Sequence, residues 1–154
     1  MRNLLLLLSF CWSSQGRPQI GSTDPQSIVS LQSGQEQFTN RLLQQIESNT
    51  TTNFVLSPHS IHSVFSQLLQ GSGGQTKTEL ENLLGVTASD SLVEQYRILG
   101  QGLSSKGFKQ ANLIALDNGF KPKHEYQRTM GNGFQSNIME FDFTSKPQES
   151  IRKV

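Results

Sequence analysis

Two histidines and the serines beside them are the side chains in this chain best suited to chemistry. His59 and His62 are three residues apart, so on a helix both rings would lie on one face and could bind the same metal ion. A zinc site normally takes three or four protein ligands, and no further residue of a suitable type lies close by in sequence. We therefore interpret both histidines as surface or partly buried helix residues, and we expect no metal and no other cofactor.

Two enzyme-like patterns in the same region are weak. Ser57 or Ser60 beside a histidine suggests a nucleophile and its base, but the sequence has no G-x-S-x-G turn, and neighbouring helical positions do not give triad geometry. The run GSGGQT at 71–76 resembles a phosphate-binding loop only loosely, because Lys77 follows the threonine, whereas a P-loop lysine precedes it. The sequence predicts that the protein is not an enzyme.

The element that would carry these residues is a helix with clear start signals. Ser57 can cap it, and Pro58 suits the first helical position, where a missing N–H costs nothing. Apolar residues then recur at helical spacing and predict a stripe facing a sheet or neighbouring helices: Ile61, Val64, Phe65, Leu68 and Leu69. A short strand is expected just before the helix, over residues 53–56.

Helices are predicted on both sides of this segment. An apolar face at near-helical spacing indicates a helix before it: Phe38, Leu42, Leu43 and Ile46. That helix could begin near Ile28, but Gly34 weakens the extension because glycine is a poor helix former. After the central helix, Thr76 and Glu79 form a candidate capping box, and Gly85 is a suitable C-terminal glycine.

The second half of the chain reads as a mixture of strands and helices. Ser89 or Asp90 can cap a helix that runs to about residue 103. Strands are expected over 110–116 and 137–143, with a helix opened by Pro122 between them. Three residues of the later strand should lie on one side of the sheet: Met139, Phe141 and Phe143.

Residues 53–86, NFVLSPHSIHSVFSQLLQGSGGQTKTELENLLGV, resemble the N-terminal signature of the serpin family. The resemblance extends over roughly 28–154: Ala111-Asn112 is similar to a pair that introduces a central strand, and Phe141-Asp142-Phe143 to a later strand. Residues 149–154 are similar to the start of the next family helix. The resemblance implies an α+β serpin fold, N-terminal part only, in which helices A–E pack under two strands of the large sheet and helix F begins.

The same resemblance implies a site and an activity. It places Asn53, Ser57 and Ser60 at the shutter, the zone where the large sheet opens, although Ser57 can also be read as a helix cap and Ser60 as a first-turn residue. Serpins inhibit serine-type endopeptidases with a reactive loop near their C-terminus, which is cleaved and inserts into the sheet while the protease stays trapped as an acyl-enzyme. Residues 17–154 contain no such loop, so we expect a C-terminally truncated form that does not inhibit by itself.

Two alternative functions remain open beside the inhibitor. One is a non-inhibitory serpin that acts as a carrier, storage or hormone-binding protein. The other is a 154-residue product that does nothing serpin-like. The sequence of the reactive-loop hinge would distinguish an inhibitory from a non-inhibitory serpin. The expected partner of an inhibitory full-length protein is an extracellular serine protease.

The start of the chain reads as a secretory signal. A basic residue, an apolar run of signal length and small residues before a cut after Gly16 predict a signal peptide over 1–16 and a secreted protein. A flexible extension over 17–27 and a truncated serpin domain over 28–154 follow. The one cysteine, Cys11, lies in the signal. The sequon at Asn49 predicts a glycan.

Charge gives little indication of a charged partner. The chain has 13 basic and 12 acidic residues, so neither nucleic acid nor a membrane surface is expected as a partner. No later run is long enough to span a membrane. The helix after Asp90 has only Arg97 as a base, with Lys106 and Lys109 following it, so heparin binding is not expected.

Overall fold

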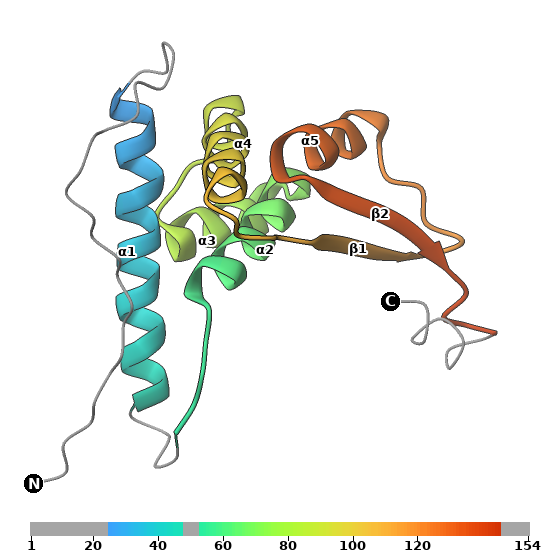
Figure 1. The fold of residues 1–154 in the computed structure, drawn as a ribbon. Helices are drawn as coiled ribbons and strands as arrows, with labels where there is room; N and C mark the ends of the chain where they lie inside the picture. The colour runs from blue at the N-terminus through green and yellow to red at the C-terminus, as the bar shows by residue number, and fades with distance from the viewer. Residues whose placement is uncertain (1–24, 48–52, 146–154) are drawn as a thin grey trace, which may run out of the picture.

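Five helices and a two-stranded sheet form the part of the protein that the computed structural model describes, residues 25–47 and 53–145 (Figure 1). The long helix α1 stands beside the helices α2, α3 and α4, while α5 and the sheet lie on the opposite side of them. In chain order the elements are α1 (Pro25–Glu47), α2 (Pro58–Gly71), α3 (Gly74–Leu84), α4 (Asp90–Ser105), β1 (Asn112–Asp117), α5 (His124–Phe134) and β2 (Ser136–Phe141).

Three of the predicted features lie outside the described residues: the signal peptide over 1–16, the sequon residue Asn49 and the helix start over 149–154. Helix α1 begins at Pro25, within the stretch predicted as an extension.

The start of α2 follows its sequence signals. Ser57 has extended backbone angles and accepts a hydrogen bond from the backbone N–H of Ser60 at 3.3 Å, with Pro58 next in the chain. This side-chain acceptor satisfies one of the N–H groups that a helix start leaves unpaired. The predicted cap of α2 is therefore confirmed.

The predicted capping box of α3 is wrong. The helix begins at Gly74, its cap is Gly73, and no side chain bonds to that end. Gly74 has a positive φ of 57°, a conformation that glycine adopts without strain, so the chain turns into the helix two residues before Thr76. The other end agrees with the sequence, since Gly85 closes α3 in the left-handed conformation with φ 66°.

Helix α1 runs unbroken through Gly34, which the sequence suggested would weaken it. A Cβ atom at Gly34 would lie 2.7 Å from Val86 Cγ1, 2.8 Å from the Leu84 carbonyl oxygen and 2.9 Å from that of Gly85. The bare Cα therefore allows α1 to approach the end of α3 closely. Packing at this crossing offsets the low helix propensity of glycine.

Strands β1 and β2 are parallel, and α5 makes the crossover between them, as parallel pairing requires. The register pairs Asn112 with Ser136 and continues to Asp117 with Phe141. Ile114 and Ile138 form one cross-strand pair and pack against the helical core, so this face of the sheet is covered.

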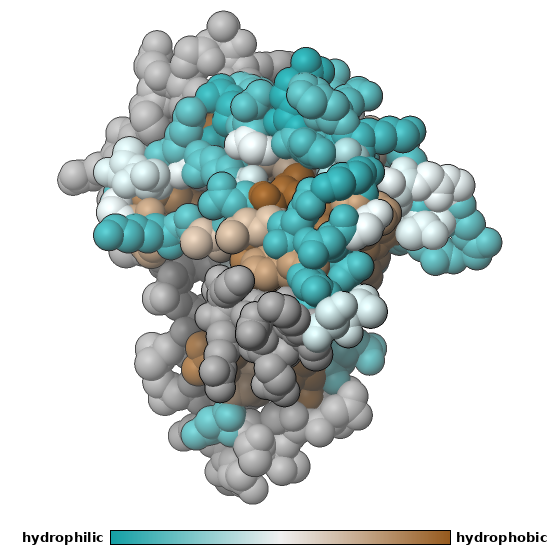
Figure 2. All heavy atoms as spheres, turned by 90° about the vertical axis from the view of Figure 1, so that its right-hand side faces the viewer, coloured by the Kyte–Doolittle hydropathy of each residue, from teal (hydrophilic) through white to brown (hydrophobic). Residues whose placement is uncertain are grey.

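The opposite face of the sheet is partly open. Met139 is 45 % exposed and shares this face of β2 with the buried Phe141. Phe143, the third residue of the predicted row, lies beyond the end of β2, and its ring packs against that of Phe141 with the centroids 5.6 Å apart. Leu113 on β1 is also exposed. Figure 2, which views the molecule from the right-hand side of Figure 1, shows apolar residues gathered across the middle with polar residues above them.

Residues 53–56 are not a strand, contrary to the sequence prediction. They pair with neither of the two described strands, and Val55 is fully exposed. A strand requires a neighbour to take its backbone hydrogen bonds, and the described part of the chain offers none here.

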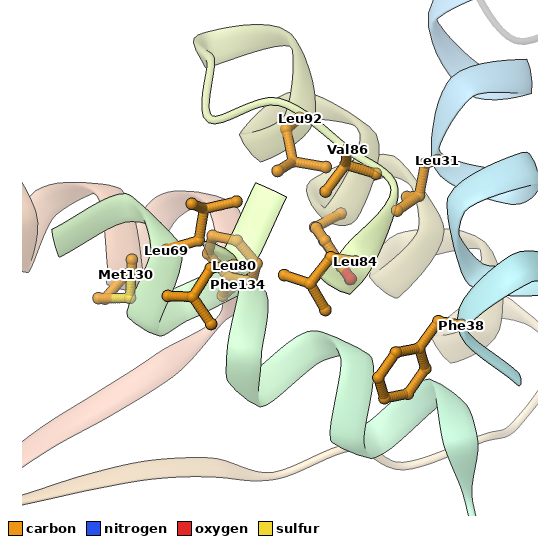
Figure 3. Packing of buried hydrophobic residues seen from close by; sticks show 10 residues of the cluster. Leu31, Phe38, Leu69, Leu80, Leu84, Val86, Leu92, Met130 and Phe134 are labelled. Carbon is orange, nitrogen blue, oxygen red and sulfur yellow. The ribbon is translucent and has the colours of Figure 1, made fainter. Parts of the chain in front are cut away.

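One apolar cluster joins all five helices and extends from Met130 at one end to Phe38 at the other (Figure 3). Leu69 from α2, Leu84 from α3 and Met130 from α5 are fully buried within it. Ten residues form the cluster: Leu31, Phe38, Leu69, Leu80, Leu84, Val86, Leu92, Tyr96, Met130 and Phe134. It fixes α2 among its neighbours α1, α3 and α5.

Candidate functional site

Two of the three predicted shutter residues are joined at the start of α2. The hydroxyl oxygens of Ser57 and Ser60 lie 2.9 Å apart and share a hydrogen bond, in addition to the capping bond. Both side chains are exposed, as is Asn53, four residues earlier in the irregular segment. The arrangement gives α2 a start made of small polar groups that adds little bulk.

The inner face of α2 is polar, which the sequence analysis did not predict. Its buried residues are His62, Ser63, Ser66, Gln67 and Leu69. Val64 and Leu68 are instead 59 % and 52 % exposed, so the prediction that they face the sheet or other helices is wrong. Ile61 and Phe65 lie between these faces and pack at the edge of the core.

His62 is at the centre of this polar face, and its hydrogen bonds define its protonation. Its Nε2 lies 3.0 Å from the Leu84 carbonyl oxygen, which can only accept, so Nε2 carries the proton. Its Nδ1 lies 2.5 Å from the Tyr96 hydroxyl oxygen and accepts a hydrogen bond from that hydroxyl. Ser66 then donates to the Tyr96 oxygen at 3.0 Å. Helices α2, α3 and α4 are thus linked through one imidazole ring.

Gln67 makes a second link, from α2 to the sheet and α5. The Ser136 hydroxyl donates to Gln67 Oε1 at 2.6 Å, and the Tyr126 hydroxyl donates to the Gln67 backbone oxygen at 3.3 Å. Because a buried polar group without a partner is costly, these bonds are needed once Gln67 faces inward. Polar groups therefore attach α2 to its surroundings as well as apolar ones.

Burial shifts the pKa values in this network away from charge. It lowers the pKa of His62, an effect that the Leu84 carbonyl partly opposes and the neighbouring His59 reinforces. It also lowers the pKa of His59 and raises the pKa of Tyr96 to about 12. All three side chains are consequently neutral near pH 7.

These groups form a structural network and have no reactive geometry. Ser66 Oγ lies 3.4 Å from His62 Nδ1, but both residues are fully buried and Tyr96 already donates to that nitrogen. The prediction that both histidines are surface or partly buried holds for His59 and is wrong for His62, which has no exposed area. Among the described residues, no three His, Cys, Asp or Glu side chains gather as metal ligands would.

Sequence spacing alone could not assign the inner face of α2. The polar residues 62, 63, 66 and 67 and the apolar residues 61, 64, 65 and 68 both recur at helical spacing. The apolar set was predicted to face inward because apolar side chains usually do. The sequence did not reveal the hydrogen-bond partners that allow the polar set to be buried. Tyr96 and Ser136, which supply hydrogen bonds to that polar face, come from elements far along the chain.

The basic residue of α4 is already paired. Arg97 donates from Nε and from Nη2 to the two carboxylate oxygens of Glu94, one turn before it. This ion pair accounts for the lowered pKa of the Glu94 carboxyl.

Within the described residues, no helix is both long enough and apolar enough to cross a membrane.

Comparison with known proteins decides the family. The model of the family Serpin (serine protease inhibitor) matches residues 33–154, which is most of the chain. The chain belongs to the serpin family. Its fold is the N-terminal part of the serpin fold, as the resemblance predicted, and serpins are not enzymes.

Relatives of this serpin are distant and much longer. Iripin-1 from Ixodes ricinus is 27 % identical over 126 residues, covering 77 % of this chain and 32 % of its own. Intracellular coagulation inhibitor 1 from Tachypleus tridentatus is 31 % identical over 108 residues, covering 65 % of this chain and 26 % of its own. This serpin chain therefore spans about a third of the length of the curated relatives it matches.

A solved structure supports the assignment of the fold. The mouse protein-Z dependent protease inhibitor superposes with a TM-score of 0.70 at 22 % identity, covering 79 % of this chain and 36 % of the other. The helices and the parallel strand pair of this serpin therefore have the arrangement of serpins of known structure.

Proposed function

We propose that this chain forms the N-terminal part of a secreted serpin that inhibits a serine-type endopeptidase. The observation that carries the proposal is the family match over residues 33–154, because it covers nearly the whole described fold. In such an inhibitor the α2 region supports the large sheet, which must open when the cleaved loop enters.

The start of α2 suits the proposed shutter role. Ser57 and Ser60 satisfy each other and one backbone N–H within a small volume, so strands above them could separate without breaking bulky contacts. Polar inner residues meanwhile hold α2 to α3, α4 and β2 through His62 and Gln67. We therefore assign α2 a supporting role: its inner face is fixed to its neighbours, and its N-terminal end presents only small polar side chains.

Secretion and a glycan at Asn49 belong to the same proposal, because a signal-like N-terminus and a sequon occur in one chain. Heparin is not proposed as a partner, since Arg97 of α4 is bound to Glu94. Mass spectrometry of medium from secreting cells tests this part: we expect a chain beginning at Arg17 with added mass on Asn49. A cytosolic product that keeps Met1 would contradict the secretion.

The inhibitory function is tested by adduct formation. The full-length protein, meaning the longest natural product that contains this chain, should form a band stable in SDS with at least one extracellular serine protease. A protease whose catalytic serine has been blocked beforehand is the control, because it cannot form an acyl-enzyme.

The 154-residue chain is tested alongside and should give no adduct, since it matches only about a third of the length of a relative such as Iripin-1. Failure of the full-length protein with a broad protease panel would favour a non-inhibitory serpin. An adduct with the 154-residue chain would contradict the assignment of inhibition to the longer form.

A further inference from the structure

A small cavity lies where α2 meets α4 and the junction of α5 with β2. Its volume is about 10 Å³, close to the smallest space that admits one water molecule. His59 and Ser63 border it from α2, Tyr96 from α4, and Gln110 and Gln135 from the segments before β1 and β2. The cavity is thus lined by polar residues at a point where four elements converge.

Two polar atoms on the wall of this cavity have no hydrogen-bond partner among the described residues: Nε2 of His59 and Oγ of Ser63. Both atoms are buried, and Ser63 as a whole is only 1 % exposed. They are one helical turn apart on α2, so both atoms border the same space. A buried polar atom without a hydrogen-bond partner destabilises the fold, so both atoms require one.

The protonation of His59 follows from the network beside it. The Tyr96 hydroxyl donates its hydrogen bond to His62 Nδ1, so its oxygen can only accept from other groups. Gln35 presents its amide NH₂ group to this network, and an amide nitrogen can only donate.

The same Gln35 amide nitrogen lies 3.1 Å from His59 Nδ1. This nitrogen of His59 must therefore accept. Because burial keeps His59 neutral, the remaining proton is on Nε2. An N–H donor consequently points at the cavity and requires an acceptor there.

We propose that this cavity is a binding site for one water molecule, which accepts from His59 Nε2–H and hydrogen-bonds to the hydroxyl of Ser63. A water oxygen has two acceptor sites and two protons, so it can serve both side chains and still donate to the oxygen atoms of Gln110 or Gln135. Its size excludes any larger ligand. The bridging water would attach α2 to the strand side of the molecule at a second point, besides the Gln67 bond.

Two observations on the full-length protein test the site directly. A crystal structure at high resolution should contain one water within about 2.7–3.2 Å of both His59 Nε2 and Ser63 Oγ. Long-range proton–nitrogen NMR should find the proton of His59 on Nε2, with a cross-relaxation signal to water. A His59 ring protonated at Nδ1, an empty cavity, or a direct bond from Nε2 to a protein group would overturn the proposal.

A variant tests the site in solution. Ser63→Val removes the hydroxyl and fills the space with methyl groups, so magnetic relaxation dispersion should count one long-lived water fewer than in the wild type. Ser33→Ala, an exposed serine on α1, is the matched control and should leave the count unchanged. An equal count in Ser63→Val would refute the site, and the crystal and NMR tests decide the matter if that variant does not fold.

Discussion

Replacing Gly34 by alanine tests the close crossing of α1 over the end of α3. Alanine normally stabilises a helix interior relative to glycine by about 1 kcal/mol. Here the added Cβ would meet Val86 Cγ1, the Leu84 oxygen and the Gly85 oxygen, all within 2.9 Å. Contacts this short force something to move, and overpacking of this kind costs about 1–3 kcal/mol.

The upper half of that range applies, because two of the three atoms are backbone oxygens that cannot rotate away. The cost therefore exceeds the gain in helix propensity. We expect Gly34→Ala to lower the free energy of unfolding of the full-length protein by about 1–2 kcal/mol.

A matched control separates the two effects. Gly102 is also a helical glycine, in α4, and a Cβ atom there would have no atom within 4 Å. Gly102→Ala should therefore raise the unfolding free energy by up to about 1 kcal/mol, which leaves a gap of about 2–3 kcal/mol between the variants. Urea denaturation followed by circular dichroism measures both. If Gly34→Ala proves as stable as Gly102→Ala, α1 does not cross α3 at this distance and the reasoning fails.

Three further predictions concern α2. Burial lowers the pKa of His62 in the folded protein below its ordinary 6.5. The contribution of neutral His62 to stability is therefore present above pH 6.5 and is lost as the pH falls toward the folded pKa. The urea midpoint should drop between pH 7.5 and pH 5, and it should drop less steeply in His62→Gln. A pH slope unchanged in that variant would refute the assignment. Ser57→Ala removes the helix cap and should cost about 1 kcal/mol in the same assay, and an unaltered midpoint would count against the cap. The 154-residue chain alone should show no cooperative unfolding as a monomer, because Val64 and Leu68 are 59 % and 52 % exposed and burying each such side chain contributes roughly 1.5–3 kcal/mol. A single sharp transition in a monomer would contradict this expectation.

The sequence predicted elements well wherever local chemistry decides them. Ser57-Pro58 and Gly85 set the ends of their helices through bonds and angles within a few residues, and both predictions are confirmed. Both strands formed within two residues of the predicted starts, since their apolar runs are bounded by turn residues. The predicted capping box at Thr76 is wrong because Gly74, two residues earlier, adopts the positive φ at which α3 begins.

The orientation of α2 could not be predicted, because distant residues decide it. The inner placement of His62 depends on Leu84 and Tyr96, and that of Gln67 depends on Ser136. Nothing near α2 in sequence reveals these partners. Val64 and Leu68 were therefore predicted to face inward because they are apolar. The same reason explains why the cavity beside His59 could only be found in three dimensions.

The polar face of α2 also sets an order of events during synthesis of the protein. When the ribosome has released Tyr96, His62 can complete its bonds, but Gln67 must wait for Ser136. At about 5–20 residues per second, the roughly 40 intervening residues take about 2–8 s to make. During this interval a buried amide lacks its partner, so the nascent helix is held on one side only. A chaperone that binds the emerging chain would find α2 incompletely docked until β2 appears.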